Sequence, residues 1–188
     1  MIALWIILGV VALLLVVCVM WYISCYNRFM RLKNNIDESR STIDVSLKKR
    51  FDLIPNLVEA VKGYEKHEKE TLEAVISARG GVASAKNAQE KVKAENELTG
   101  ALRQLLVVAE AYPELKANAN FIDLQNQLKS METEIANSRR YFNATVKEYN
   151  NLVSVFPSNI IARQKGYTKE AMYEIENPAE RQNVKVQF

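Results

Sequence analysis

The first 26 residues of the chain lack any charged side chain. The stretch is almost entirely apolar, with Trp5 near one end and Trp21 and Tyr22 near the other. About 20 apolar residues are enough for a helix to cross a hydrocarbon core ~30 Å thick, and aromatic side chains favour the two interfaces. The absence of charge therefore predicts a transmembrane helix over residues 1–26.

No lysine or arginine precedes Arg28. A cleaved secretory signal would begin with basic residues and have a shorter apolar core, so we expect the span to be retained. The first basic residues, Arg28, Arg31 and Lys33, follow the span directly. The positive-inside rule then predicts a single-pass protein with its N-terminus outside and its C-terminal domain in the cytoplasm. The same three residues are candidate contacts for anionic lipid headgroups.

Cysteine and histidine are scarce, with Cys18, Cys25 and His67 as the complete set. Both cysteines belong to the apolar stretch, so neither a disulfide framework nor a zinc site is expected. His67 has no second ligand at a suitable spacing, and we predict no metal and no cofactor. Cys25 leaves one alternative open, a bacterial lipoprotein anchor: Ser24 is suitably small, but Tyr22 stands where leucine is expected.

Catalytic motifs are also missing. Gly80-Gly81 lacks the Lys and Ser/Thr of a phosphate loop, and the chain contains no Gly-x-Ser-x-Gly or His-Glu-x-x-His. We therefore expect no catalytic residues and no enzyme; a hydrolase with an unrecognised site is the least favoured alternative. The net charge of +3 comes from 25 basic and 22 acidic residues. This mixture describes solvated helix faces and not a nucleic-acid footprint.

Proline and glycine are rare enough to allow long helices. A first stripe of apolar residues predicts a helix from Tyr26 that kinks or turns at Pro55. A second helix should stop at Gly80-Gly81, and a third should end near Tyr112-Pro113. Residues 114–156 contain neither proline nor glycine and carry a heptad seam, which predicts a single long fourth helix. The first stripe comprises Phe29, Leu32, Ile36, Ile43, Leu47, Phe51 and Ile54.

These elements predict an all-α protein: a transmembrane helix followed by an antiparallel four-helix bundle with long coiled-coil-like helices. The expected divisions are residues 1–26 for the span, 27–157 for the bundle and 158–188 for an irregular C-terminal segment. That segment reads as a loop with one helical turn and an extended tail, whose last residues, 184–188, alternate as a short strand would.

The segment from Lys48 to Asn56 admits two interpretations. In the structural one, Asp52 or Asn56 caps a helix at a turn and the apolar residues fill the end of the bundle. In the functional one, the segment is a basic and polar contact surface at the tip of the bundle. The candidate residues of that surface are Lys48, Lys49, Arg50, Asp52, Pro55 and Asn56.

Several stretches resemble the LemA family. They are Tyr26-Asn27, residues 43–58, 61–64 and 109–118, Tyr141-Phe142-Asn143 and Phe156-Pro157. The resemblance implies a bacterial membrane protein with a short N-terminal anchor, an antiparallel helical bundle and no agreed enzymatic activity. Some relatives resemble lipoproteins with a cysteine before the Tyr-Asn pair, where Cys25 stands. Ser39-Arg40 departs from the Ala-Trp that the family often shows.

The favoured hypothesis is a non-enzymatic, membrane-anchored scaffold in a bacterial cytoplasmic membrane, which self-associates or docks an unidentified protein. The alternative is an anionic-lipid-binding protein that shapes or senses the membrane. A homo-oligomer is expected because the long fourth helix leaves a surplus of apolar seam around Tyr149, Leu152 and Phe156. That surplus must be covered either by another subunit or by Tyr167, Met172 and Tyr173 folding back.

Overall fold

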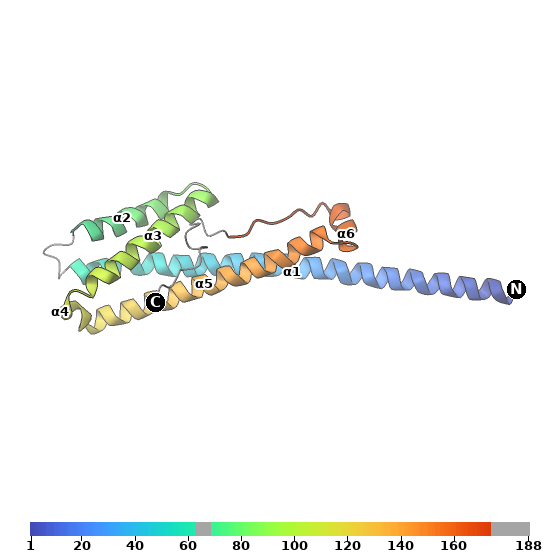
Figure 1. The fold of residues 1–188 in the computed structure, drawn as a ribbon, viewed down its shortest axis with the longest axis horizontal. Helices are drawn as coiled ribbons and strands as arrows, with labels where there is room; N and C mark the ends of the chain where they lie inside the picture. Colours follow the sequence, from blue (N-terminus) through green and yellow to red (C-terminus); the bar gives the residue numbers. More distant parts are fainter. Residues whose placement is uncertain (63–68, 174–188) are drawn as a thin grey trace, which may run out of the picture. The chain divides into compact units, whose positions relative to one another are not determined.

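The computed structural model describes residues 1–62 and 69–173, and these residues are helical with no strand (Figure 1). The chain divides into two compact units. The first combines Met1–Ile43 with the part of the chain that begins at Asn137, and the second is Asp44–Ala136. Helices α1 and α5 each contribute residues to both units. The predicted division into residues 1–26, 27–157 and 158–188 stays a prediction.

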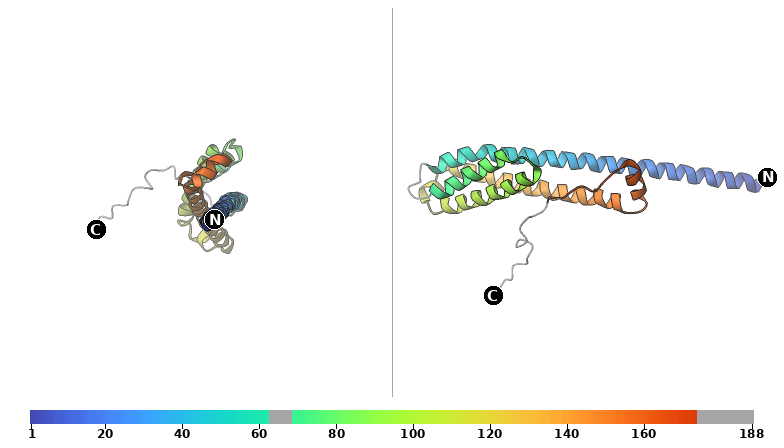
Figure 2. Two further views of the ribbon diagram at one scale, coloured as in Figure 1. Left: turned by 90° about the vertical axis from the view of Figure 1, so that its right-hand side faces the viewer. Right: turned by 90° about the horizontal axis from the view of Figure 1, so that it is seen from above.

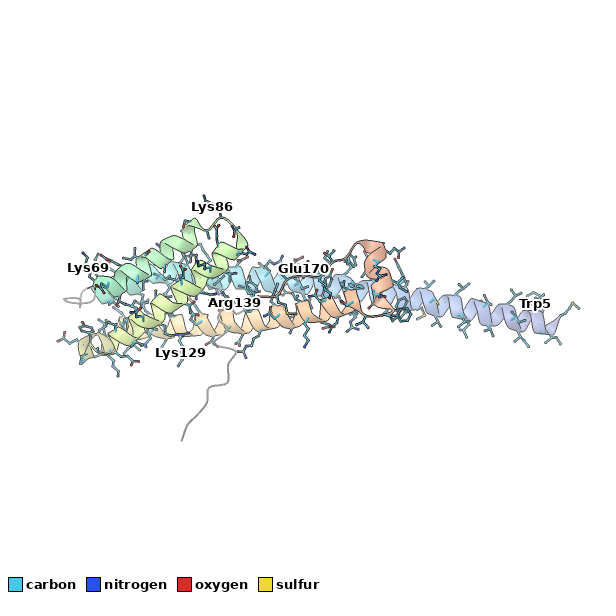
Figure 3. All side chains as sticks on the ribbon, turned by 45° about the horizontal axis from the view of Figure 1, so that its top comes forward. Trp5, Lys69, Lys86, Lys129, Arg139 and Glu170 are labelled. Carbon is cyan, nitrogen blue, oxygen red and sulfur yellow. The ribbon has the colours of Figure 1, made fainter. Side chains whose placement is uncertain are left out.

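Helix α1 (Ile2–Lys62) begins the first unit with a fully exposed apolar segment. Its most apolar window has no buried residue, and the helix is long and apolar enough to cross a membrane. Figure 3 shows the side chains of this segment, Trp5 among them, projecting all round the helix axis. A helix that is apolar on every side is compatible with anchoring in a membrane.

The rest of the first unit packs around the next turns of α1. Here α1 meets α5 (Ala119–Ser154), and α6 (Ser158–Lys165) follows a cis Phe156–Pro157 bond. The segment 167–173 then runs in an extended, non-helical conformation; we call it the strap. The buried apolar side chains of this unit include Phe29, Leu32, Ile36, Ile43, Phe142, Val146, Tyr149, Ile161 and Ala162.

The second unit contains the C-terminal part of α1 with α2 (Lys69–Ser84), α3 (Ala88–Ala109), the short α4 (Pro113–Lys116) and the start of α5. Helices α2 and α3 lie side by side, as Figure 1 and the right-hand view of Figure 2 show. All five helices contribute side chains to one core: Leu53, Ile54, Leu57, Val61, Leu72, Val75, Leu98, Leu102, Leu105, Ala109, Leu115, Phe121 and Leu128.

Two predicted helix boundaries are wrong. Helix α1 runs through Pro55 without ending, and α2 runs through Gly80 and Gly81 to Ser84. At Pro55 tertiary packing outweighs local preference, since Ile54 and Leu57 on either side of it are buried. Two helical glycines cost about 2 kcal/mol together, which burial of one or two aliphatic side chains offsets.

The fourth predicted helix is shorter than expected. Residues 113–116 form the separate α4, and Asn118 accepts hydrogen bonds from the backbone N–H of Asn120 (3.0 Å) and Phe121 (3.2 Å). This side-chain cap fixes the start of α5 at Ala119. Within α5 every seventh residue from Phe121 to Tyr149 is buried, namely Phe121, Leu128, Ile135, Phe142 and Tyr149. Phe156 lies beyond the helix and is 75% exposed.

Residues 158–165 form the two-turn helix α6, where a loop with one helical turn was expected. Gly166 ends it in the left-handed region (φ +68°), and the N–H of Tyr167 donates to the carbonyl of Ala162 at 2.8 Å. This pattern turns the chain sharply out of the helix and into the strap. The predicted strand at 184–188 lies outside the described residues.

Candidate functional site

The candidate contact surface of the sequence is placed on the C-terminal part of α1. Lys48, Lys49, Asp52, Pro55 and Asn56 are exposed, and Lys48 Nζ donates to both carboxylate oxygens of Asp52, at 2.5 and 2.6 Å. Since the helix does not end here, neither Asp52 nor Asn56 acts as a cap at a turn. Lys49 Nζ lies 4.0 Å from Glu134 Oε1 of α5.

Arg50 does not belong to that surface, because its side chain is only 1% exposed. Its guanidinium donates to the carboxylate of Glu95, to Thr99 Oγ1 at 2.8 Å and to Glu132 Oε1 at 2.5 Å. Glu95 and Thr99 lie on α3 and Glu132 on α5, so one side chain of α1 ties three helices together. The Thr99 hydroxyl in turn donates to the carbonyl of Glu95 at 2.9 Å.

The Arg50 cluster acts as a structural lock. A buried cation is tolerated only where carboxylates and hydrogen bonds meet it, so sliding one helix by a turn would leave charges unpaired in the core. The sequence held a signal for this position. Ile43, Leu47, Arg50, Ile54, Leu57 and Val61 alternate in spacings of four and three, which places Arg50 on the seam and Phe51 beside it.

Helix α1 continues through Pro55 because a side chain of another helix supplies the hydrogen bond that proline cannot make. A residue at position 55 would normally donate its N–H to the carbonyl of Phe51. That carbonyl accepts instead from Arg79 Nε of α2, at 3.4 Å. The Arg79 guanidinium carbon also lies 4.1 Å from the centroid of the Phe51 ring. One arginine therefore satisfies the backbone and covers the ring.

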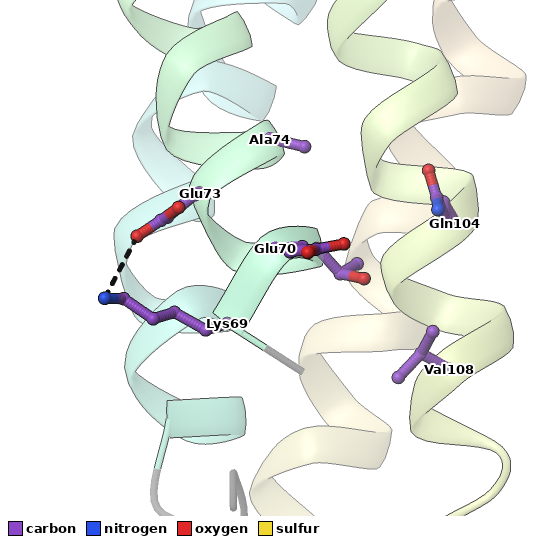
Figure 4. Close-up of a pocket in the computed structure, with 7 residues that line it drawn as sticks. Lys69, Glu70, Glu73, Ala74, Gln104 and Val108 are labelled. Carbon is purple, nitrogen blue, oxygen red and sulfur yellow. Dashed lines mark ion pairs between the residues drawn. The ribbon is translucent and has the colours of Figure 1, made fainter. Parts of the chain in front are cut away.

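A groove lies between α2 and α3 in the second unit (Figure 4). Glu70 of α2 and Gln104 and Val108 of α3 face one another across it, and Lys69 pairs with Glu73 at 3.6 Å on its rim. Within the described ranges no group of three or more His, Cys, Asp or Glu side chains is placed to hold a metal ion. His67 lies outside the described residues. The described residues that line the groove offer charge but no paired nucleophile and base.

In the first unit, two asparagines of α5 hold the strap by its backbone. Asn143 Nδ2 donates to the carbonyl of Tyr173 at 2.9 Å, and the N–H of Tyr173 donates back to Asn143 Oδ1 at 2.8 Å. Asn150 makes the same reciprocal pair with Glu170, at 2.9 Å in both directions. Seven helical residues rise ~10.5 Å and three extended residues ~10 Å, so the two pairs stay in register.

An aromatic cluster closes the same unit where the strap begins. The ring centroid of Phe29 lies 5.9 Å from that of Tyr149 and 5.2 Å from that of Tyr167. Burial raises the pKa of Tyr149, and the charge of Glu170 adds to the shift. Burial also raises the pKa of Tyr167, with smaller effects from Tyr26 and Tyr22.

The C-terminal segment thus folds back over part of the seam. This is the second of the two predicted ways to cover it, the first being another subunit. Tyr167 packs at the Phe29–Tyr149 contact, and the rings of Tyr173 and Phe142 lie 5.0 Å apart. Met172 is 41% exposed and does not cover the seam. Phe156 is left open.

The candidate headgroup contacts have different surroundings. Arg28 pairs with Glu148 at 2.9 Å, with about half of each side chain exposed. Lys33 Nζ lies 5.3 Å from the centroid of the Tyr167 ring, and Arg31 is exposed. Of the two free thiols, Cys18 is exposed and Cys25 is buried in the unit.

Sequence reasoning missed three groups: Glu95 and Glu132 around Arg50, Arg79 beneath Pro55, and the asparagine pair. The spacing of seven between Asn143 and Asn150 places them on one face of α5. Their partners, however, are backbone groups of a segment without periodicity, and such groups leave no trace in a sequence pattern.

Comparisons with known proteins give consistent results. A model described as the LemA family matches residues 39–188. Protein LemA of Metamycoplasma hominis is 25% identical over 147 residues, which cover 76% of this chain and 66% of the relative. Magnetosome protein MamQ 2 of Paramagnetospirillum magneticum is 27% identical over 180 residues, covering 82% and 66%. Magnetosome protein MamQ of Magnetospirillum gryphiswaldense is 25% identical over 198 residues, covering 92% and 72%. The chain thus spans about two-thirds of the length of the first two relatives.

Proposed function

Since the chain belongs to the LemA family, we propose that it is a membrane-anchored helical scaffold that assembles with copies of itself or docks a protein partner, without catalysis. One observation carries this proposal. The exposed apolar segment of α1 continues into helical units in which buried charged side chains bind one another, as Arg50 binds Glu95. The core shared by α1, α2, α3 and α5 supports an antiparallel four-helix bundle with coiled-coil-like seams.

The proposed location is a bacterial cytoplasmic membrane, crossed once with the N-terminus outside. Arg28, Arg31 and Lys33 just after the span support this orientation. A reporter that is active only outside the cytoplasm, fused after Phe188, should give no signal. A matched fusion before Met1, behind an exported leader, should be active. A strong signal from the Phe188 fusion would overturn the orientation.

The proposed assembly is a homo-oligomer. Apolar side chains that lie open in the second unit support it, among them Val45, Ile76 and Val107, each more than half exposed. Light scattering on the full chain in detergent should give a mass of several chains per micelle. One chain per micelle at micromolar concentration would contradict self-association and leave docking of a partner.

The proposed contact surface for a partner consists of Lys48, Lys49, Asp52, Pro55 and Asn56. Their exposure along one stretch of α1 supports it. Lys49→Glu and Asn56→Lys should reduce assembly or partner capture without lowering the melting temperature, because neither side chain is buried. Lys86→Glu, on the loop before α3, is the matched control, and an equal effect there would argue against a specific surface.

The competing proposal, a protein that binds anionic lipid to shape or sense the membrane, rests on Arg31 and the basic residues near it. Replacing Arg28, Arg31, Lys33 and Arg40 by glutamine should abolish binding to anionic liposomes under this proposal and leave oligomers intact under the scaffold proposal. The ion pair between Arg28 and Glu148 favours the scaffold, since that guanidinium already has a carboxylate partner.

A further inference from the structure

Three apolar side chains stand open at the corner where α5 ends and α6 begins. Val155 is 57% exposed, Phe156 75% and Ile160 56%. The neighbouring Ile161 and Ala162 of α6 are each only 1% exposed, so α6 has one face packed into the first unit and another that is open among the described residues. We call Val155, Phe156 and Ile160 the apolar corner.

The apolar corner lies beside the end of the uncharged segment of α1. The hydroxyl of Tyr22 donates to Gln164 Oε1 at 3.5 Å, and Lys165 Nζ lies 5.5 Å from the centroid of the Tyr26 ring. Figure 1 and the right-hand view of Figure 2 show α6 next to α1 at the point where the N-terminal part of α1 begins to run alone. Tyr22 and Tyr26 therefore hold the last turn of α6 at the level where the apolar segment stops, and the apolar corner lies at the other end of this eight-residue helix.

A bilayer that holds the exposed segment of α1 must end near the same level. Trp21 and Tyr22 are the side chains that favour a membrane–water interface, and Arg28 is the first charge after them. Lys165 and Arg163, in the last turn of α6, add cations at this depth. The first unit thus presents an apolar tip flanked by positive charge, which is the pattern of an interfacial helix.

We propose that the apolar corner is a second membrane contact. Val155, Phe156 and Ile160 insert into the boundary between headgroups and acyl chains of the leaflet in which the span ends, and Arg163 and Lys165 meet lipid phosphates. This inference rests on the proposed membrane anchor and extends it, because the first unit is then held at two points and docks against the lipid surface.

A second copy of the chain fits the apolar corner less well than lipid does. A stable protein interface buries roughly 800 Å² on each partner. Three side chains at one bend cover a small part of such an area, and the cations beside them would face the same cations in a symmetric pair. The phosphates of a lipid surface satisfy those cations and impose no limit on area.

The test places the photo-crosslinker p-benzoylphenylalanine at Phe156 in the otherwise unchanged full chain. Tyr141 is the matched control, since it is an aromatic residue of α5 that is 54% exposed and lies ~22 Å along the helix from Phe156. The two proteins are reconstituted into vesicles of phosphatidylcholine and phosphatidylglycerol and irradiated. Mass spectrometry then measures the lipid adduct on each labelled peptide.

We expect an adduct at position 156 at least tenfold above that at position 141. Equal adducts at the two positions, in protein that floats with the vesicles, would show that the apolar corner does not contact the membrane and would leave the proposed anchor intact. Loss of flotation would overturn the anchor and with it this inference. In a second measurement, Ile160→Lys should lower the adduct at position 156 severalfold, whereas Val107→Lys in the second unit should not.

Discussion

At the scale of single residues, the stability of the second unit depends on the pairing of the buried Arg50 guanidinium with its carboxylate partners. Glu95→Gln leaves the guanidinium in the core with one carboxylate fewer, and we expect a loss of ~3–5 kcal/mol in the free energy of unfolding. The double variant Arg50→Met, Glu95→Gln should recover part of that loss, because both fully buried charges are gone and the remaining carboxylate, Glu132, is 35% exposed to water. Chemical denaturation in detergent, followed by circular dichroism, measures both. Additive losses would mean that the two residues do not interact.

Two glycines give opposite predictions from one kind of substitution. Gly166 has φ +68°, where a side chain is strained, so Gly166→Ala should destabilise the first unit by ~1–2 kcal/mol. Gly80 sits inside α2 with no atom within 4 Å of an added Cβ. Gly80→Ala should therefore stabilise the second unit by ~0.5–1 kcal/mol. Thermal unfolding of the two variants beside the parent chain tests both signs. A stabilising Gly166→Ala would contradict the left-handed turn.

At the scale of elements, α1 depends on α2 for its continuity. Arg79→Met removes both the donor to the Phe51 carbonyl and the cation over its ring, and we expect a loss of ~1–2 kcal/mol. In a Pro55→Ala background the helix makes its own hydrogen bond to Phe51. The same Arg79→Met change should then cost measurably less. The four proteins form a double-mutant cycle, and a coupling free energy near zero would show that Arg79 does not replace the missing bond.

The strap is the second element whose position depends on a few groups. Asn143→Ala or Asn150→Ala should release it, because each change removes two hydrogen bonds to its backbone. Hydrogen exchange of the amides of Glu170 and Tyr173 should rise at least tenfold while the rest of α5 keeps its protection. Asn151→Ala, an exposed neighbour on the same helix, is the matched control. Unchanged protection in the Asn150 variant would show that the aromatic ring contacts, and not these hydrogen bonds, hold the strap on α5.

At the same scale, some helical features could be predicted from the sequence and others could not. The long helices and the heptad seam of α5 follow from periodicity, because each buried side chain imposes its spacing on the sequence. The breaks at Pro55 and Gly80-Gly81 were predicted from local preference, and packing overrides it there. The asparagine pair and Arg79 could not be foreseen, since each acts on backbone groups of a segment far away in the chain.

At the scale of the whole molecule, the tyrosines predict how the first unit responds to pH. The raised pKa values of Tyr149 and Tyr167 mean that the folded state holds these protons more tightly than the unfolded state. Stability from this source is complete below the ordinary tyrosine pKa of ~10 and falls as the pH rises above it. Absorbance at 295 nm should show two tyrosines titrating late, and strap amides should lose protection over the same pH range. Tyr167→Phe should remove one late step and weaken the pH dependence, and two unshifted titrations would contradict the burial of these hydroxyls.

The reciprocal pairs at Asn143 and Asn150 have one more consequence, which concerns sequence drift. They read only main-chain atoms, which every amino acid except proline carries in full. Position 170 can therefore change its side chain without losing these hydrogen bonds, whereas Tyr173 also packs its ring against Phe142. Proline is the one substitution that each pair forbids. Substitutions at position 170 can therefore alter the charge that the strap carries while its main chain stays bound to α5.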